Sequence, residues 1–165
     1  MRVEPSGPQL PVRLENLRTI RIAGKDRIEF LQGQLTQDAS RLAGGGSLLA
    51  GWASAKGRLL LITQIAQWDE AVWMTVPAPL ADSLAARLRM FVLRAAVNVD
   101  VPTVNLFGLT ADTAIPAAAA DCGIPPSGSD DTSVDSASCL MRVHGDPSRI
   151  IMITHADVAG QTTDR

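Results

Sequence analysis

The sequence predicts an α+β fold with a mainly antiparallel sheet and covering helices. Three apolar runs, at residues 48–54, 58–66 and 71–76, follow one another with only short turns between them. That arrangement is typical of an antiparallel meander. Two segments of helical spacing, at 28–42 and 80–91, can cover one face of such a sheet.

The length and composition are those of one folded domain. The chain has 165 residues, of which 46% are hydrophobic and 19% are charged, and this is enough for one hydrophobic core. The net charge of −2 excludes the overall basic field that drives nonspecific nucleic-acid binding. The first residues carry no apolar core of signal-peptide length, and no run is long enough to span a membrane. We therefore expect a cytoplasmic protein that binds neither nucleic acid nor membrane directly.

An apolar stripe marks the first helical segment. It has five members at steps of three and four: Ile28, Leu31, Leu35, Ala39 and Leu42. Asp26 and Glu29, three residues apart at its start, form an expected capping box. Gly33 costs roughly 1 kcal/mol in a helix relative to Ala, so we expect a break or a close approach there.

Polar side chains are concentrated in the same segment. Around the expected break lie Gln32, Gln34, Thr36, Gln37 and Asp38, which would present amide, hydroxyl and carboxylate groups. Thr and Asp prefer caps to helix interiors because their side chains compete for the backbone. Both a binding surface and a plain solvated face fit this pattern, and composition alone favours the solvated face.

The remaining elements follow from hydrophobic pattern and turn residues. Residues 1–18 are an expected leader, loose through Pro11, and residues 156–165 an expected polar tail. Strands are expected at 19–23, 97–101, 104–110, 140–143 and 149–154, and turns at 55–57, 67–70 and 144–147. A helix entered through Pro77 and Pro79 should bury Leu80, Leu84 and Leu88, followed later by a short helix at 114–121 and a flexible loop at 123–138.

The cysteines and histidines match no standard metal site. Cys122 and Cys139 form no CxxC pair, and we expect free thiols. His144 and His155 do not complete a zinc-binding spacing with them. We expect no metal to be bound by this chain.

A second motif follows the central segment. Residues 52–62 read Trp-Ala-Ser-Ala-Lys-Gly-Arg-Leu-Leu-Leu-Ile, with Lys56 inside an expected hairpin turn. The order and spacing of Gln-Gly-Gln-x-Thr-x-Asp at 32–38 and Ala-Lys-Gly-Arg at 55–58 resemble the YgfZ-type folate-binding proteins. These are relatives of the aminomethyltransferase, or T-protein, of the glycine cleavage system. The resemblance runs from residue 20 to 101 and more weakly to about 154.

The resemblance implies a protein that binds tetrahydrofolate or a derivative, supports the assembly or repair of iron-sulfur proteins and is linked to tRNA modification. Its partners would be iron-sulfur client or assembly proteins. The folate-binding residues that it implies are Gln32, Gly33, Gln34, Thr36, Asp38, Lys56, Gly57, Arg58 and Arg94. Amides suit the alternating donors and acceptors of a pterin edge, and a cation suits the glutamate tail. In the fold of that family, residues 19–101 would form the first α/β folate-binding subunit, and 102–155 the opening elements of the second.

The sequence departs from the family in three places. The family's signature Lys-Gly-Cys-x-x-Gly-Gln-Glu is absent, and neither cysteine has that context. Leu61 and Ile62 stand where the aminomethyltransferases carry a pair of aspartates. Arg94-Ala95-Ala96 stands where the family has Arg-Ser-Lys, so one contact to an anionic ligand is lost.

Three functions remain open from the sequence. The missing aspartates favour a non-catalytic folate-binding scaffold, for which no catalytic residue is assigned. A folate-dependent aminomethyl or one-carbon transferase is the alternative, and a truncated domain without a competent site is the third. An unpaired strand edge would also allow two copies to form a homodimer.

Overall fold

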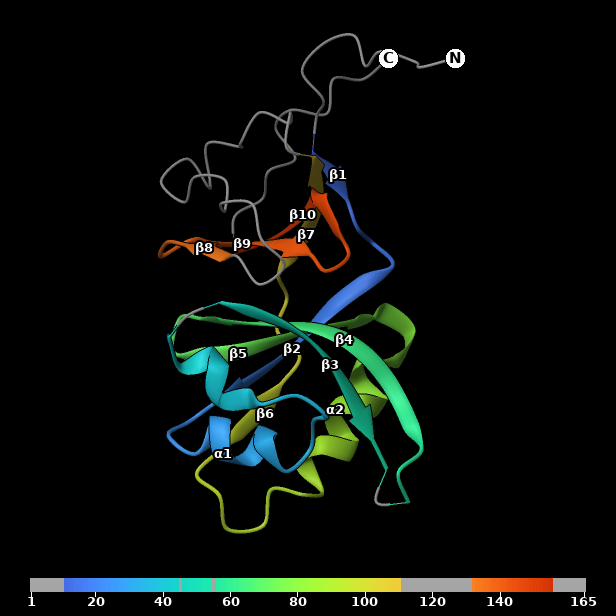
Figure 1. Cartoon of the computed structure of the whole chain (residues 1–165), viewed down its shortest axis with the longest axis vertical. Coiled ribbons are helices and arrows are strands. Elements are labelled where there is room, and N and C mark those ends of the chain that lie inside the picture. Colours follow the sequence, from blue (N-terminus) through green and yellow to red (C-terminus); the bar gives the residue numbers. More distant parts are fainter. Residues whose placement is uncertain (1–10, 45, 55, 111–131, 156–165) are drawn as a thin grey trace, which may run out of the picture.

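The computed structural model describes residues 11–44, 46–54, 56–110 and 132–155. They form three layers, with short helices on one face of a five-stranded sheet and a second five-stranded sheet on its other face (Figure 1). All strand pairs are antiparallel. The predicted α+β class is confirmed.

The first sheet contains the predicted meander. Its strands, in the order β3-β4-β5-β2-β6, are β3 (Ser47–Ala53), β4 (Leu59–Trp68), β5 (Ala71–Pro77), β2 (Leu17–Ala23) and β6 (Asn98–Asp100). The turn between β4 and β5 consists of Asp69 and Glu70 and is shorter than the expected turn at 67–70. Both residues adopt positive φ, at 48° and 52°. Two such residues match the twist of the flanking strands. On β6, Val99 is buried, and the Asp100 carboxylate forms an ion pair with Arg21 at 3.3 Å.

The first helical segment breaks where Gly33 predicted a break. Helix α1 (Arg27–Gln32) ends at Gly33, and the 3-10 helix η1 (Ala39–Gly44) begins six residues later. Between them, Leu35 forms an isolated bridge with Trp52 of β3. The apolar stripe is still buried against the first sheet despite the break. Its buried members are Leu31 in α1, Leu35 in the connection, and Ala39 and Leu42 in η1.

The predicted capping box is wrong. Asp26 occupies the N-cap position of α1, but its side chain makes no capping hydrogen bond. Its Oδ2 instead accepts a hydrogen bond from the Ala96 amide, at 2.7 Å. A partner far along the chain therefore replaces the local one, and it anchors the segment that leads into β6.

The second helix buries a different stripe from the one expected. It starts as the 3-10 helix η2 (Ala78–Leu80) and continues as α2 (Ala81–Arg89). The tighter first turn shifts the phase of the helix, so Leu80 is 47% exposed while Ala81, Ala85 and Leu88 are buried. Leu84 is half-buried against the same core. Among the described residues, no helix has both the length and the apolarity needed to cross a bilayer.

The second sheet joins the two ends of the described chain. Its strands, in the order β1-β7-β10-β9-β8, are β1 (Val12–Arg13), β7 (Asn105–Thr110), β10 (Asp146–Thr154), β9 (Ser138–Val143) and β8 (Thr132–Val134). Strands predicted at 104–110, 140–143 and 149–154 are confirmed. Strand β8 lies inside the expected loop at 123–138, and the predicted helix at 114–121 lies outside the described residues.

Two tryptophans join the sheets. Trp68 and Trp73 of the first sheet pack with Leu106, Met141 and Ile153 of the second. Their rings lie 4.9 Å apart between centroids. The Trp73 indole donates to the Trp68 carbonyl at 2.9 Å. Cys139 is buried in the same cluster and forms no disulfide with another described residue, and Cys122 lies outside the described residues.

Gly24→Ala should destabilise the protein, because a Cβ at this position would lie 2.1 Å from the Ala96 carbonyl oxygen and Gly24 has a φ of 113°. Strained backbone of this kind costs about 1–3 kcal/mol, and overpacking adds about 1–3 kcal/mol. We expect the free energy of unfolding in urea to fall by about 2–6 kcal/mol. Gly33→Ala is the matched control, because the nearest atom to its Cβ would be 3.6 Å away. Equal losses in the two variants would contradict this packing.

Candidate functional site

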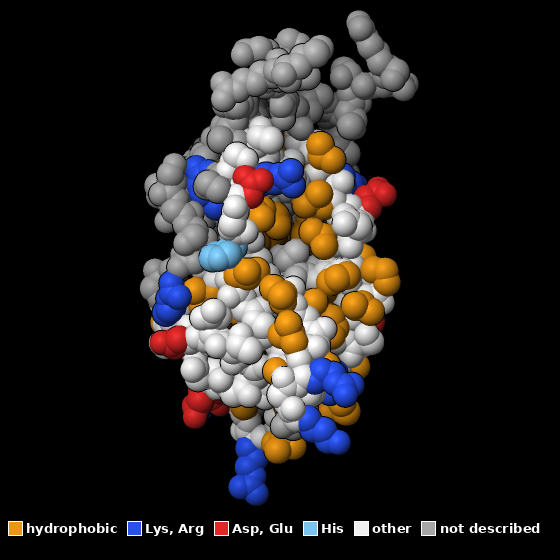
Figure 2. All heavy atoms as spheres, turned by 45° about the vertical axis from the view of Figure 1, so that its right-hand side comes forward, with side chains coloured by type: hydrophobic (Ala, Val, Ile, Leu, Met, Phe, Trp, Pro, Cys, Tyr) orange, Lys and Arg blue, Asp and Glu red, His pale blue; other side chains and the backbone are white. Residues whose placement is uncertain are grey.

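Two pockets lie beside the hairpin formed by β3 and β4. The amide pocket has a volume of about 260 Å³ and is lined by Gly33, Gln34, Leu35, Thr36, Ala53, Ser54 and Phe91. The cationic pocket has a volume of about 450 Å³ and is lined by Ser54, Lys56, Arg58, Leu60 and Arg87. Ser54 lines both pockets, so they are neighbours. Figure 2 brings the right-hand side of Figure 1 forward, where this hairpin lies, and shows basic side chains near its lower end with hydrophobic side chains above them.

Two of the predicted site residues hold the chain between α1 and η1. The Gln32 side-chain oxygen accepts a hydrogen bond from the Ala39 amide at 2.7 Å. Asp38 Oδ1 accepts from the Ser40 hydroxyl at 2.7 Å and from the Ser40 amide at 3.0 Å. These side chains satisfy backbone groups at the start of η1, as residues of this type commonly do. Neither of them lines the amide pocket or the cationic pocket.

Thr36 ties the same segment to the edge of β3. Its amide donates to the Gly51 carbonyl at 2.8 Å, and its Oγ1 accepts from the Gly51 amide at 2.9 Å. Gly51 is needed for this approach, because a Cβ there would lie 3.0 Å from Thr36 Oγ1. Thr36 lines the amide pocket while its oxygen serves the strand, and the hydroxyl proton remains a donor.

Gln34 is the predicted residue that is most available to a ligand. It is half-buried in the wall of the amide pocket. Within the described residues, its side-chain amide has no hydrogen-bond partner. A primary amide offers two donors and one acceptor group on one plane. Gln34 can therefore read a donor–acceptor edge of a bound ring.

The hairpin turn holds the two predicted cations. Ser54 closes the turn with three hydrogen bonds: its amide donates to the Arg58 carbonyl at 2.8 Å, its carbonyl accepts from Gly57 at 2.8 Å, and its hydroxyl accepts from the Arg58 amide at 3.1 Å. Gly57 has a φ of 74°, which suits glycine at a tight turn. Lys56 and Arg58 are exposed, and neither forms an ion pair with another described residue.

The structure adds two residues that the sequence did not assign to the site. Arg87, on the exposed face of α2, joins Lys56 and Arg58 in the cationic pocket. Phe91, 43% exposed just beyond α2, lines the amide pocket. An exposed aromatic residue after a helix was a weak signal for Phe91. No sequence signal brings Arg87 to the hairpin, because their meeting depends on how α2 crosses the sheet.

Arg94 is not brought into the site. It is exposed and lines neither pocket. It lies two residues before Ala96, which Asp26 anchors by its amide. At the positions where the resemblance leads one to look for aspartates, Leu61 packs on the core and Ile62 is 61% exposed.

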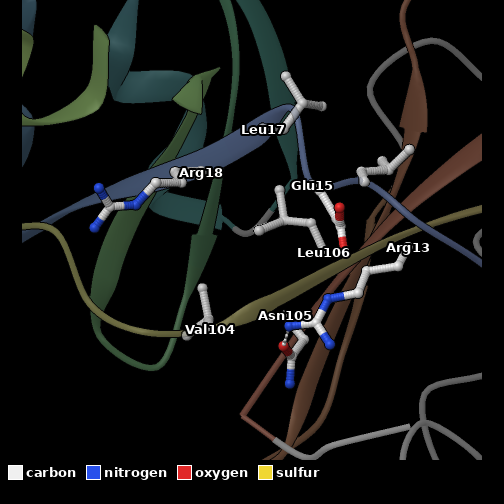
Figure 3. Close-up of a pocket in the computed structure, with 8 residues that line it drawn as sticks. Arg13, Glu15, Leu17, Arg18, Val104, Asn105 and Leu106 are labelled. Carbon is white, nitrogen blue, oxygen red and sulfur yellow. Dashed lines mark hydrogen bonds between the residues drawn. The ribbon is translucent and has the colours of Figure 1, made fainter. Parts of the chain in front are cut away.

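A third pocket lies where the chain passes between the two sheets (Figure 3). It has a volume of about 220 Å³, and its walls include Arg13, Glu15, Arg18 and Asn105. Arg13 donates to the Asn105 side chain at 2.8 Å, and Arg18 pairs with Asp82 at 3.0 Å. Arg13 is therefore engaged within the second sheet, and Arg18 ties β2 to α2. In the described part of the chain, no three His, Cys, Asp or Glu side chains come together as metal ligands.

Thr36→Val should weaken the attachment of this segment, because it leaves the Gly51 amide without its side-chain acceptor. We expect a loss of about 0.5–1.5 kcal/mol in the free energy of unfolding, and faster hydrogen exchange at Gly51. Thr36→Ser keeps the hydroxyl and is the control. Unchanged exchange at Gly51 in the valine variant would show that this hydrogen bond does not hold the segment.

Asp38 should titrate below the ordinary carboxyl value. The Ser40 hydroxyl, and next the Ser40 amide, hold the pKa of Asp38 below 3.8. Because the folded pKa is the lower one, the contribution of this carboxylate is present above the unfolded pKa and is lost as the pH falls through the folded pKa. Carbon-13 NMR titration should give a midpoint that rises in Ser40→Ala. The control is Ser83→Ala, whose hydroxyl bonds to Leu80, and a midpoint that moves equally in both variants would contradict the assignment.

Comparison with known proteins places this site in context. No protein-family model matches the chain. The chain is 28% identical to the tRNA-modifying protein YgfZ of Klebsiella pneumoniae (strain 342), over 99% of this chain and 51% of that protein. It is 24% identical to the tRNA-modifying protein YgfZ of Serratia proteamaculans (strain 568), over 96% and 48% of the two chains. The chain thus spans about half the length of the curated relatives that it matches.

The fold has a counterpart among solved structures. The crystal structure of the glycine cleavage system aminomethyltransferase T from Bartonella henselae matches with a TM-score of 0.70 and 18% sequence identity. The match covers 92% of this chain and 42% of that one. Together, these comparisons confirm the resemblance predicted from the two motifs: the chain is similar in sequence to YgfZ-type proteins and has the fold of part of an aminomethyltransferase T.

Proposed function

We propose that this chain is a non-catalytic scaffold that binds tetrahydrofolate or a derivative and supports the assembly or repair of iron-sulfur proteins. The proposal links it to tRNA modification, the role printed in the names of its YgfZ relatives. The observation that carries it is the pair of pockets that share Ser54, one neutral and one cationic. The ligand-binding unit in this proposal is residues 19–101, and residues 102–155 correspond to the opening elements of a second subunit.

The amide pocket suits the ring end of a folate. Gln34 supplies free amide groups, and Thr36 supplies a hydroxyl proton, so the wall can meet alternating donors and acceptors. Phe91 adds an exposed aromatic side chain to the lining of this pocket. Aromatic rings pack favourably against other rings in offset or edge-on arrangements. A flat heteroaromatic ring therefore fits this pocket better than a flexible polar ligand does.

The cationic pocket suits the carboxylate end. Lys56 and Arg58 line the pocket that shares Ser54 with the amide pocket, so a ligand that extends past Ser54 meets positive charge. Charge-assisted hydrogen bonds from ammonium and guanidinium groups to carboxylates are stronger than neutral ones. The amide pocket alone, at about 260 Å³, is smaller than the roughly 300–1,000 Å³ of typical ligand pockets. A ligand that occupies both pockets accounts for their adjacency.

Two features support a scaffold over a one-carbon transferase. Leu61 and Ile62 place apolar side chains where the transferases carry aspartates. Asp38, the acidic residue of the first motif, is engaged by Ser40 outside the pockets. A carboxylate that serves the backbone is poorly placed to act as a base. Product formation from an aminomethyl donor and tetrahydrofolate would reverse this choice.

The partner in this proposal is an iron-sulfur client or assembly protein in the cytoplasm. Exposed apolar side chains on β4 and just after α2 give it a surface to contact: Leu59, Ile62, Met90, Phe91 and Leu93. Exposed apolar groups that gather on one face often mark interaction sites. The predicted homodimer would need an unpaired strand edge. The edge strands β6 and β8 are only three residues long, and Thr36 already pairs with the edge of β3. Edge pairing stays a prediction.

The proposal predicts binding of a stable reduced folate, such as 5-formyltetrahydrofolate, in calorimetric titration of the full chain. Gln34→Ala removes the free amide and should weaken binding by about 0.5–1.5 kcal/mol. Lys56→Ala removes an exposed charge contact and should cost about 0.2–1 kcal/mol. The matched control is Lys25→Ala, because Lys25 is exposed and lines neither pocket.

The outcome separates the functions cleanly. Binding that weakens in both pocket variants and not in Lys25→Ala supports the proposal. A chain that is folded by circular dichroism and binds no reduced folate contradicts it, and leaves a structural domain without a competent site. Equal weakening in Lys56→Ala and Lys25→Ala would mean that net charge, and not the cationic pocket, governs the affinity.

A further inference from the structure

The last turn of α2 contacts the amide pocket and the far edge of the first sheet at the same time. Helix α2 lies between β6 and the free end of the β3–β4 hairpin (Figure 1). Phe91, just beyond the helix, lines the amide pocket. Arg89, two residues earlier, donates from its Nε to the Val99 carbonyl of β6 at 2.8 Å. The helix end is therefore fastened to one edge of the sheet while it presents an aromatic ring near the other.

Helical spacing couples these two contacts. Successive side chains of a helix are about 100° apart around its axis, so Arg89 and Phe91, two positions apart, face nearly opposite directions. The winding continues past the end of α2, because the Phe91 amide donates to the Leu88 carbonyl at 3.0 Å. The next amide, that of Val92, donates to the Arg89 carbonyl at 3.1 Å. A rotation of this turn that released Arg89 from β6 would therefore also move the Phe91 ring.

The buried face of α2 is small, so polar contacts matter for its orientation. Its buried side chains are two alanines and one leucine: Ala81, Ala85 and Leu88. Alanines form low ridges that interlock weakly with a neighbouring layer. At the start of the helix, Asp82 pairs with Arg18 at 3.0 Å, but these side chains are 80% and 39% exposed, and exposed ion pairs contribute little. The bond from Arg89 to Val99 is partly buried and has a charged donor, which makes it the stronger tie.

We propose that Arg89 is a positioning residue for the folate site: by holding the end of α2 on β6, it keeps the Phe91 ring in the wall of the amide pocket. This inference rests on the proposed function, in which Phe91 supplies the aromatic contact to the ligand ring. Arg89 itself lines neither the amide pocket nor the cationic pocket. Its effect on a bound folate therefore passes through Phe91.

Fluorine NMR of the free chain reads the position of the Phe91 ring. Labelling with 4-fluorophenylalanine gives one signal for each of the three phenylalanines, and the signal that Phe91→Leu removes belongs to Phe91. Arg89→Gln should shift or broaden that signal and leave those of the buried Phe30 and Phe107 nearly unchanged. Arg89→Lys keeps a charged donor and should restore the signal in part. Arg18→Gln is the matched control, because it removes the tie at the other end of α2, and it should leave the signal as it is.

Calorimetric titration with 5-formyltetrahydrofolate tests the consequence for binding. Phe91→Leu should weaken binding by about two- to tenfold, because an aromatic contact to the ligand ring is lost. Arg89→Gln should weaken it by no more than Phe91→Leu does, and Arg18→Gln should leave it unchanged. In the double variant Arg89→Gln/Phe91→Leu, the loss should equal that of Phe91→Leu alone, because two residues that act through one contact do not add. Circular dichroism checks that every variant is folded.

The results distinguish this inference from the function on which it rests. An unchanged Phe91 signal in Arg89→Gln overturns the inference, and so do losses of affinity that add in the double variant. If Arg89→Gln binds reduced folate as tightly as the wild type does, Arg89 has no positioning role and the folate site stands. A folded wild-type chain that binds no reduced folate overturns the proposed function, and the positioning role falls with it.

Discussion

The site depends on the attachment of residues 35–36 to the edge of β3. Helix α1 ends at Gly33, so the chain that follows has no helical hydrogen bonds of its own. The bridge between Leu35 and Trp52, and the paired hydrogen bonds between Thr36 and Gly51, supply a replacement. This attachment forms one wall of the amide pocket. It also covers an edge strand that would otherwise present unpaired backbone groups.

The layered packing makes the hairpin a rigid support with one free end. Strand β4 begins with exposed Leu59 and Ile62 and ends with buried Trp68, where the second sheet lies over it. The buried part anchors the strand through the tryptophan cluster, and the exposed part carries the turn with Lys56 and Arg58. A binding site at the free end of a well-anchored strand combines accessible side chains with a fixed backbone. The second sheet therefore contributes to the site in two ways: it packs on the buried end of β4, and it leaves the hairpin turn exposed.

Polar residues within one motif divide into two roles. Gln32 and Asp38 satisfy backbone amides at the start of η1, and Thr36 satisfies one on β3. Gln34 is left with its amide uncommitted among the described residues. The division follows from geometry, because a chain that leaves a helix exposes amides that nearby short polar side chains can reach. A row of polar residues therefore does not mean that each of them contacts a ligand. In this motif, Gln34 is the residue whose side chain is available for binding.

The local structure and much of the core follow from the amino-acid sequence. Alternation and turn residues predicted the β3–β4–β5 meander, Gly33 predicted the helix break, and the stripe through Leu31 and Leu42 predicted the buried face. Tertiary structure alone decided which distant segments meet. Asp26 bonds to Ala96 and not to its own helix, Arg87 joins the cationic pocket, and Arg94 stays outside it. The reason is physical: side-chain spacing sets which face of an element is apolar, whereas the crossing of α2 over the sheet sets which polar groups face one another, and that crossing depends on packing between residues far apart in the chain.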